Sequence, residues 1–404
     1  MPRPVPLADA PALAIPRVRP ALLAKGFRPF FLCAAAWAVI AMPLWLLVLH
    51  GRMPPGTYLP GPLWHAHEML FGFTAAVIAG FLLTAIGNWT QQETATGLPL
   101  ASLVGLWGLG RLGLLLADRL PPAVPACLDL AFLPALGVAC ARPIVRTVNR
   151  RNYQFLVLLA LLFAANVLVH LGALGAIPTG IRRGHWLATH VVVVMILVIT
   201  GRIVPLFTRN ATRVDTIYSL PLLDRLAIAG MVVVAALDLL AMPEVLVALA
   251  AGLTAVAVVA RTWGWGLRHT TAHPLLWILH LGHLWIAVGL ALRAAAGFGV
   301  VAAGGSTALH AFTGGAIAAL TLGMMTRVTL GHTGRLLAVP PAMTAAFGLV
   351  LLAGIVRLAG PLLSPAFWLP AMVLAGAFFS LAFAAYLVHY APFLLAPRPD
   401  GRPG

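Results

Sequence analysis

The stretch WHAHEMLFGF at positions 64–73 decides the fold, because it opens a long apolar run of membrane-spanning character. His65, His67 and Glu68 are its imidazole and carboxylate side chains. Such groups are expensive inside a bilayer unless they are partnered, so they usually mark a functional site. Residues i and i+2 of a helix point about 200° apart, so His65 and His67 serve two centres if both are helical, or one if the chain is extended at His65. The alternative is that these histidines lie at the level of the lipid headgroups.

The composition is that of a polytopic membrane protein. Of the 404 residues, 61% are hydrophobic and 9% are charged, whereas soluble domains carry about a quarter charged residues. The net charge of +16 is spread over short loops between apolar runs, which indicates topology signals and excludes a nucleic-acid-binding protein. We expect no cleaved signal peptide, because the first 26 residues lack a compact apolar core.

The three cysteines exclude several kinds of site. Cys33, Cys127 and Cys140 lie within apolar runs and show no C-x-x-C spacing. A disulfide framework, a thiolate zinc site and covalent attachment of a c-type haem therefore have no support in the sequence.

Twelve apolar runs are each near the length that crosses a bilayer as a helix, which predicts an all-α transmembrane bundle of about 12 spans. They cover positions 29–49, 65–87, 98–117, 122–141, 153–173, 184–207, 222–241, 243–260, 274–296, 305–327, 341–360 and 366–390. We predict a cytoplasmic tail over 1–26, one transmembrane domain over 27–392 and a second cytoplasmic tail over 393–404. The seventh and eighth runs are separated only by a tight turn, so the total of twelve depends on counting these two separately.

The arginines predict the orientation. With both termini inside, the inner segments carry 19 basic residues and the outer segments carry 6, with Arg111 left within a span. Because short cytoplasmic loops are enriched in Lys and Arg, this distribution predicts an N-in/C-in protein.

Thirteen histidines in so apolar a chain predict metal or haem ligation, because imidazole suits copper and haem iron. Most of the histidines predicted within the membrane lie in its outer half, and His280 and His283 rise from the inner side on one helix face. The alternative for each is a hydrogen bond that links two helices. The candidate metal ligands are His65, His67, His190, His280, His283 and His310.

Arg111 and Asp129 are predicted at similar depth on adjacent antiparallel spans, so we expect an ion pair that clamps the two helices together. Arg202 lies near the inner end of the sixth span, beside Pro205. It either extends to the membrane interface or binds an anionic group of a cofactor.

Four stretches together resemble one family of bacterial membrane proteins, the NnrS family. They are GFRPFF at 26–31, WHAHEMLFGF at 64–73 with NWT at 88–90, GRIVPLFT at 201–208, and HAFTGGAIAALTLGMMTRVTLGHTGR at 310–335. The resemblance implies a haem- and copper-containing protein of the bacterial inner membrane, linked to nitric oxide and denitrification. The matching positions are His65, His67, Glu68, Arg202, His310, Arg327, His332 and Arg335. His283 stands where we expect an aromatic residue in the family, so we weight His280 above it.

The leading hypothesis is a haem and copper protein, with haem of b type, that binds nitric oxide and protects against it, with reductive turnover as an extension of that role. Cofactor-binding candidates are His65, His67, His190, His280, His310 and Arg202. Glu68 is a candidate catalytic residue that relays protons, or else it orients a neighbouring histidine. The alternatives are a sensor or haem-repair protein without turnover, and a transporter built from two six-span halves.

His332 and Arg335 are the other candidate catalytic residues. A helix of 22 residues spans about 33 Å, so His332 is too far from His310 to share a small site with it. We expect an inner-side role for this pair, either docking a quinol or admitting protons, beside contact with membrane lipid. The alternative is a folded loop that serves topology alone.

Overall fold

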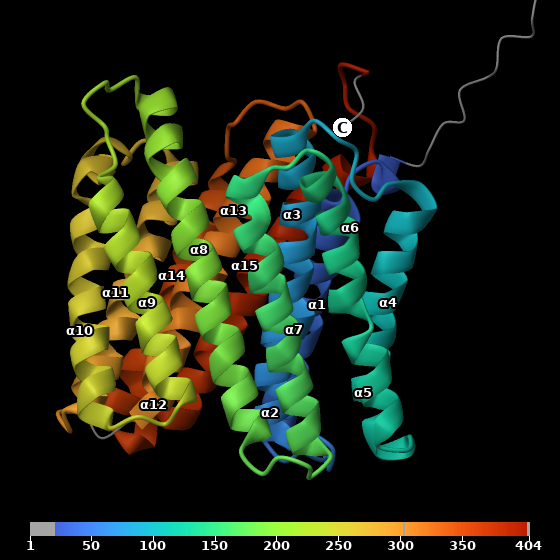
Figure 1. Ribbon diagram of the computed structural model, residues 1–404, viewed down its shortest axis with the longest axis vertical. Coiled ribbons are helices and arrows are strands. Elements are labelled where there is room, and N and C mark those ends of the chain that lie inside the picture. The colour runs from blue at the N-terminus through green and yellow to red at the C-terminus, as the bar shows by residue number, and fades with distance from the viewer. Residues whose placement is uncertain (1–20, 302–303, 402–404) are drawn as a thin grey trace, which may run out of the picture.

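The computed structural model describes residues 21–301 and 304–401, and every element in them is helical. The long helices run side by side as one bundle (Figure 1). The α-helices of the described chain are α1 (Phe27–Leu49), α2 (Gly61–His67), α3 (Ala75–Thr90), α4 (Gly97–Leu115), α5 (Ala123–Leu130), α6 (Phe132–Arg146), α7 (Tyr153–Ala173), α8 (Gly180–Thr212), α9 (Pro221–Leu239), α10 (Glu244–Arg261), α11 (Pro274–Gly297), α12 (Gly304–His310), α13 (Ala318–His332), α14 (Pro341–Leu363) and α15 (Trp368–Leu395).

Eleven segments of the described chain are long and apolar enough to cross a membrane, which confirms a polytopic helical bundle. The predicted seventh span is helix α9, which is outside those eleven and carries Asp224, Arg225 and Asp238 within its 19 residues. It packs between α8 and α10, so the bundle contains twelve long segments when α9 is included. Helix α15 ends at Leu395, slightly beyond the predicted boundary of the C-terminal tail.

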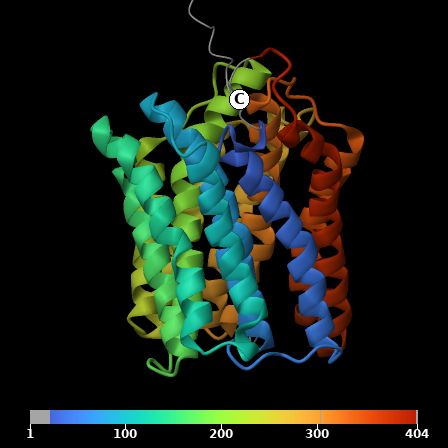
Figure 2. The same ribbon diagram turned by 90° about the vertical axis from the view of Figure 1, so that its right-hand side faces the viewer.

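The two ends of the described chain lie at the same end of the bundle (Figure 1). Figure 2 shows α1, in blue, beside α15, in red, so that the first and last spans close the bundle against each other. The side chain of Arg28 fixes this closure, because its Nη1 donates to the carbonyls of Leu394 and Ala396 at the C-terminal end of α15, at 2.8 and 2.7 Å. The inward orientation of this end stays a prediction from the arginines.

Two spans contain π-helical turns at matching places. Helix α2 continues through a π-helix, η2 (Glu68–Thr74), into α3, and α12 continues through a second π-helix, η7 (Ala311–Ile317), into α13. In each span the π-helix directly follows a motif histidine, His67 or His310. Because π-turns occur mostly where a helix is adapted to a function, they distinguish these two spans from the rest of the bundle.

A third span, helix α8, shares a sequence pattern with these two. When His67, His185 and His310 are aligned, the threonines Thr90, Thr208 and Thr333 fall at one common position further along the chain. All three threonines are buried, and each hydroxyl donates to the carbonyl one turn earlier in its helix. The same alignment places Arg202 and Arg327 at another common position, between the histidine and the threonine.

These three segments, α2–α3, α8 and α12–α13, are each the second of four successive long segments. They are also among the most deeply buried spans of the described chain, and they contact one another inside the bundle. The described fold is therefore a threefold repetition of a four-helix unit around a central trio of helices. This arrangement differs from the two matching six-span halves that a transporter would show.

Glycine sets the close approach of α7 and α8. A Cβ added at Gly184 would lie 2.5 Å from the carbonyl oxygen of Ala165, and one at Gly180 would lie 2.5 Å from that of Leu168. Small residues at such crossings let membrane helices pack backbone to backbone. The contact brings His185, the next residue on α8, against the helix that carries His170.

Candidate metal centre

A buried cluster of charged and imidazole side chains lies at the end of the bundle away from the described termini. Arg111 on α4 donates to Glu68 Oε2 at 2.7 Å and to Asp129 Oδ1, so the predicted ion pair with Asp129 exists. All three residues are at most 4% exposed. One arginine against two carboxylates leaves one net negative charge, which a buried site tolerates only with a further cation or proton.

Two histidines face the second oxygen of Asp129. His170 Nε2 lies 2.9 Å from Asp129 Oδ2, and His67 Nε2 lies 3.3 Å from the same atom. His67, Asp129 and His170 can offer one ligand atom each within 4.8 Å of one another, and among the described residues they form the single such group of three. Two imidazoles, a carboxylate and a residual negative charge together form a site suited to a metal cation.

Asn166 on α7 orients the ring of His67. Its Nδ2 donates to Asp129 Oδ2 at 2.7 Å, so its Oδ1 is left to accept from His67 Nε2 at 3.0 Å. The second ring nitrogen, Nδ1, then carries a lone pair and has no hydrogen-bond partner among the described residues. It lies 3.6 Å from Glu68 Oε1, which is also unpartnered, so Glu68 is placed to exchange a proton with His67 or to orient it.

Tyr58, in the loop before α2, supports His170 from the other side. Its hydroxyl lies 2.7 Å from His170 Nδ1. Burial, with a smaller effect of Asp129, raises the pKa of the phenol, which therefore stays protonated. A hydroxyl can donate to Nδ1 or accept from it, so His170 Nε2 can present either a proton to Asp129 or a lone pair to a metal.

His65 and His67 are both helical and face different groups, as their spacing predicts. The ring of His65 stacks on Trp45 with centroids 5.2 Å apart and planes 16° apart, and its Nδ1 is buried without a partner in the described chain. Arg357 on α14 lies within electrostatic reach of His65 and donates to His310 Nε2 at 3.1 Å. His310 Nδ1 contacts the Ser306 carbonyl at 2.7 Å, so both of its nitrogens are occupied.

His185 on α8 lies beside His67. Its ring lies 6.3 Å from that of His67 between centroids, and its Nε2 is buried without a partner in the part of the chain that the structure describes. His190, five residues further along α8, faces a different group, with Nε2 lying 3.3 Å from Asp238 Oδ2. Asp238 is also paired with Arg293 at 2.7 Å, so the surroundings of His190 resemble those of His67 in chemistry.

His280 and His283 lie together on α11, away from the cluster around Asp129. His280 Nε2 is 3.0 Å from the Thr208 hydroxyl and His283 Nδ1 is 3.1 Å from the Thr200 hydroxyl. Each ring keeps one buried nitrogen without a partner among the described residues. The two histidines are equally placed to accept a ligand, and the geometry gives no ground for ranking one above the other.

The candidates at the end of the bundle that carries the described termini have contacts of their own. Arg202 donates to Asn152 Oδ1 at 2.9 Å and lies over the Phe155 ring. His332 packs on Phe27, with ring centroids 5.6 Å apart, and the Arg335 guanidinium lies 3.9 Å from the centre of the Phe393 ring. These residues lie at the opposite end of the bundle from the cluster around Asp129, so they do not share its site.

Comparison with known families agrees with the motifs. The family model described as NnrS protein matches residues 21–398, which is nearly the whole chain. The chain belongs to the NnrS family. No curated protein matches it. NnrS membership identifies a membrane protein related to nitric oxide, from a family in which metal and haem binding are general properties.

Sequence reasoning left Tyr58, Asn166 and His170 out of the candidate site residues and treated Asp129 as a helix clamp only. A signal was present, since the predicted spans put His67, Asp129 and His170 near one membrane face. The missing information was which faces of α5 and α7 turn toward α2 and the following π-helix.

Proposed function

We propose that this NnrS-family protein holds copper and b-type haem in the bundle, binds nitric oxide there and contributes to its detoxification in the bacterial inner membrane. The observation that carries the proposal is the buried group of His67, Asp129 and His170, beside which Arg111 meets two carboxylates, those of Asp129 and Glu68. With both carboxylates ionised and the imidazoles neutral, the formal charge of these five residues is −1. Nitric oxide is small and uncharged, so a site within the bilayer meets it directly.

The donor set fits both groups. Copper binds imidazole and carboxylate, and His67, Asp129 and His170 would hold it. Haem iron takes imidazole, and several fully buried rings keep a free nitrogen among the described residues. Those rings belong to His185, His280 and His283. When bound, the two groups would supply nitric oxide binding and electron transfer.

The protein's own residues would set the protonation of the site. The Tyr58 hydroxyl can accept a hydrogen bond from His170 Nδ1–H and so leave Nε2 with its lone pair, while Asn166 fixes the ring plane of His67. Glu68 Oε1 can accept a proton released nearby, because that oxygen has no partner among the described residues. Arg357 meets no carboxylate in the described chain and would pair with a haem propionate.

The test uses the purified full-length protein. Metal analysis should find copper and the optical spectrum should show haem, and adding nitric oxide to the reduced protein should shift that spectrum. Continued consumption of nitric oxide with a quinol or another reductant would establish turnover. A spectral shift without consumption would instead favour the sensor, and absence of both cofactors would refute the proposal.

A further inference from the structure

A second feature lies on the central axis of the bundle, where the three repeat-related spans meet. A cavity of about 80 Å³ is lined by η2–α3, α8 and η7–α13, with Phe31 and Leu279 completing its wall. Most of the lining residues fall into four sets of three. The three members of a set lie the same number of residues after His67, His185 and His310 in their respective spans. The first set is Thr74, Val192 and Ile317; the second is Val77, Met195 and Leu320; the third is Ile78, Ile196 and Thr321; and the fourth is Phe81, Ile199 and Met324.

The wall of the cavity offers no free hydrogen-bonding group among the described residues. Its threonine hydroxyls are used within their own helices, because Thr74 donates to the Met69 carbonyl at 2.7 Å and Thr321 to that of Ala318 at 3.0 Å. Thr200 donates in the same way to Ile196 at 2.8 Å. Water needs two to four polar partners to occupy a cavity, whereas apolar cavities stay dry and take up xenon or benzene.

The cavity is better shielded on the side of the motif histidines. The residues of its first and second sets are all buried, which closes the cavity on the side of His67 and His185. The fourth set, which is the furthest of the four from the histidines, is only half-buried. The lining residues nearest to the histidines follow them by seven positions, or about two helical turns.

We propose that this central cavity is a binding site for small apolar gases, which collects nitric oxide about two helical turns from the candidate metal-binding histidines. The identity of the gas rests on the proposed function, whereas the affinity for an apolar gas rests on the cavity alone. A cavity of about 150 Å³ holds benzene or xenon, so 80 Å³ suits a single xenon atom or a diatomic molecule better than a polar substrate.

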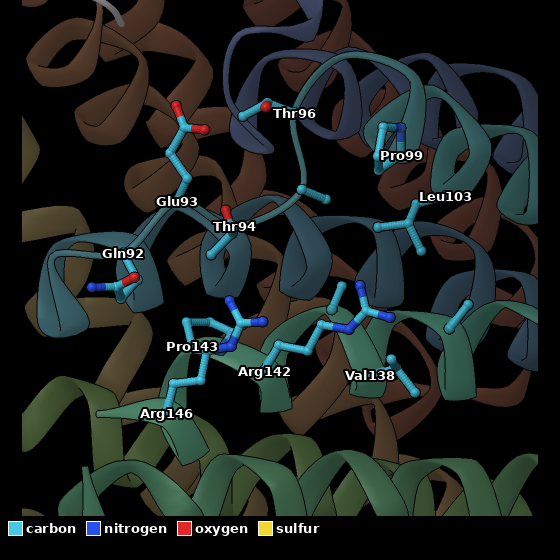
Figure 3. Close-up of a pocket in the computed structure, with 13 residues that line it drawn as sticks. Gln92, Glu93, Thr94, Thr96, Pro99, Leu103, Val138, Arg142, Pro143 and Arg146 are labelled. Carbon is cyan, nitrogen blue, oxygen red and sulfur yellow. The ribbon is translucent and has the colours of Figure 1, made fainter. Parts of the chain in front are cut away.

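Another, larger pocket has the opposite chemistry. It measures about 380 Å³ and lies between the loop after α3 and helix α6, where Arg142 and Arg146 face it together with the polar chain from Gln92 to Thr96 (Figure 3). It contains no histidine and lies near the end of the bundle that carries the described termini. A neutral gas gains nothing from two arginines, so the central cavity is the better site for it.

The first experiment locates xenon in the purified holoprotein, in crystals kept under xenon pressure. Xenon should occupy the central cavity of the wild type. Ile196→Phe should fill the space and abolish that density, while Met195→Ala should enlarge the space and raise its occupancy. Ile40→Phe, a matched change on an exposed face, should leave it unchanged. A wild type without xenon there, or with a lipid or quinone chain in its place, would overturn the proposal.

The second experiment measures nitric oxide binding to the reduced holoprotein by stopped flow. Ile196→Phe should slow association severalfold with unchanged haem and copper content, and Ile40→Phe should not. Exclusion of xenon by Ile196→Phe with an unchanged association rate would show that the cavity does not serve nitric oxide. If the wild type takes up xenon but never binds nitric oxide, the proposed function fails while the gas cavity is supported.

Discussion

Asp129 and His170 meet inside the bundle, with His170 Nε2 lying 2.9 Å from Asp129 Oδ2. The other oxygen of the same carboxylate faces Arg111. Asp129 therefore links an ion pair that stabilises the helices to a group of imidazoles that can bind a metal. Its two oxygens give it two separable roles, and the variants below are chosen to distinguish them.

Asp129→Asn should lower copper content more than it lowers stability. The amide can keep several hydrogen bonds, and Arg111 and Glu68 then neutralise each other, which removes the negative charge that favours a cation. Arg111→Gln should lower stability more than it lowers copper content, because two buried carboxylates lose their cation at a cost of about 3–5 kcal/mol. Copper analysis and thermal unfolding in detergent would measure both effects. Full copper in Asp129→Asn would contradict the assignment of this site.

Tyr58→Phe should weaken copper binding while leaving the fold intact. The change removes only the hydroxyl that lies 2.7 Å from His170 Nδ1. Loss of such an outer partner typically costs about 10–100-fold in metal affinity. A competitive titration with a copper chelator would give the affinity. Tyr218→Phe, an exposed tyrosine elsewhere, is the matched control and should bind copper as the wild type does.

Haem content should depend on buried imidazoles that keep a nitrogen without a partner. His185→Ala and His280→Ala should each lower haem absorbance strongly in protein that still inserts into the membrane, because each removes such a ring from the described bundle. His310→Ala should lower it less, since both nitrogens of His310 contact other groups, Arg357 and the Ser306 carbonyl. The control is His389→Ala, since the His389 ring nitrogen contacts a carbonyl of its own helix. Undiminished haem in both His185→Ala and His280→Ala would exclude these two rings as ligands.

The sequence predicts the bundle well, because spans are determined by length and apolarity, and it predicts contacts that depend on depth alone. Arg111 and Asp129 could be paired by counting residues from the span ends. His65 and His67 face different groups because alternate residues of a helix point about 200° apart. Both predictions use the geometry of one or two helices and need no knowledge of the wider packing.

The rest of the site depends on packing that the sequence does not display. Asn166 and His170 reach Asp129 because the glycine contacts of α7 and α8 fix how α7 is placed. The threefold repetition is equally hidden, since most equivalent positions hold interchangeable apolar residues. The histidine and the threonine of the shared sequence pattern, such as His67 and Thr90, are kept in all three copies and are the visible trace of it.

Asp118 should make stability depend on pH. It lies outside the spans and accepts from the Thr57 hydroxyl and amide at 2.7 and 2.8 Å, and these bonds lower its carboxyl pKa below 3.8. Because the carboxyl pKa is lower in the folded state than in the unfolded state, the ionised carboxylate stabilises the folded state at every pH above the unfolded-state pKa of 3.8. This stabilisation is lost as the pH falls from 3.8 through the folded-state pKa. Asp118→Asn should lower the Tm at neutral pH, and the difference from wild type should shrink as the solution becomes strongly acidic. A difference that is constant with pH would refute this.

The last prediction concerns the end of the bundle that carries the described termini. His332→Ala should leave the haem spectrum unchanged and slow reduction by a quinol. His332 ends the helix that begins near His310, so it lies at the opposite end of the bundle from the cluster around Asp129. Its ring packs on Phe27, and its carbonyl accepts from Arg398 at 3.1 Å.

A second substitution separates a chemical role of His332 from a packing role, because His332→Phe keeps an aromatic ring against Phe27 and removes the imidazole. Slow reduction in both His332→Ala and His332→Phe would support a role for the imidazole in quinol docking or proton entry. Normal reduction in the phenylalanine variant would make His332 a packing residue. Loss of haem in either variant would reject the separation of a metal region at one end of the bundle from an entry site at the other.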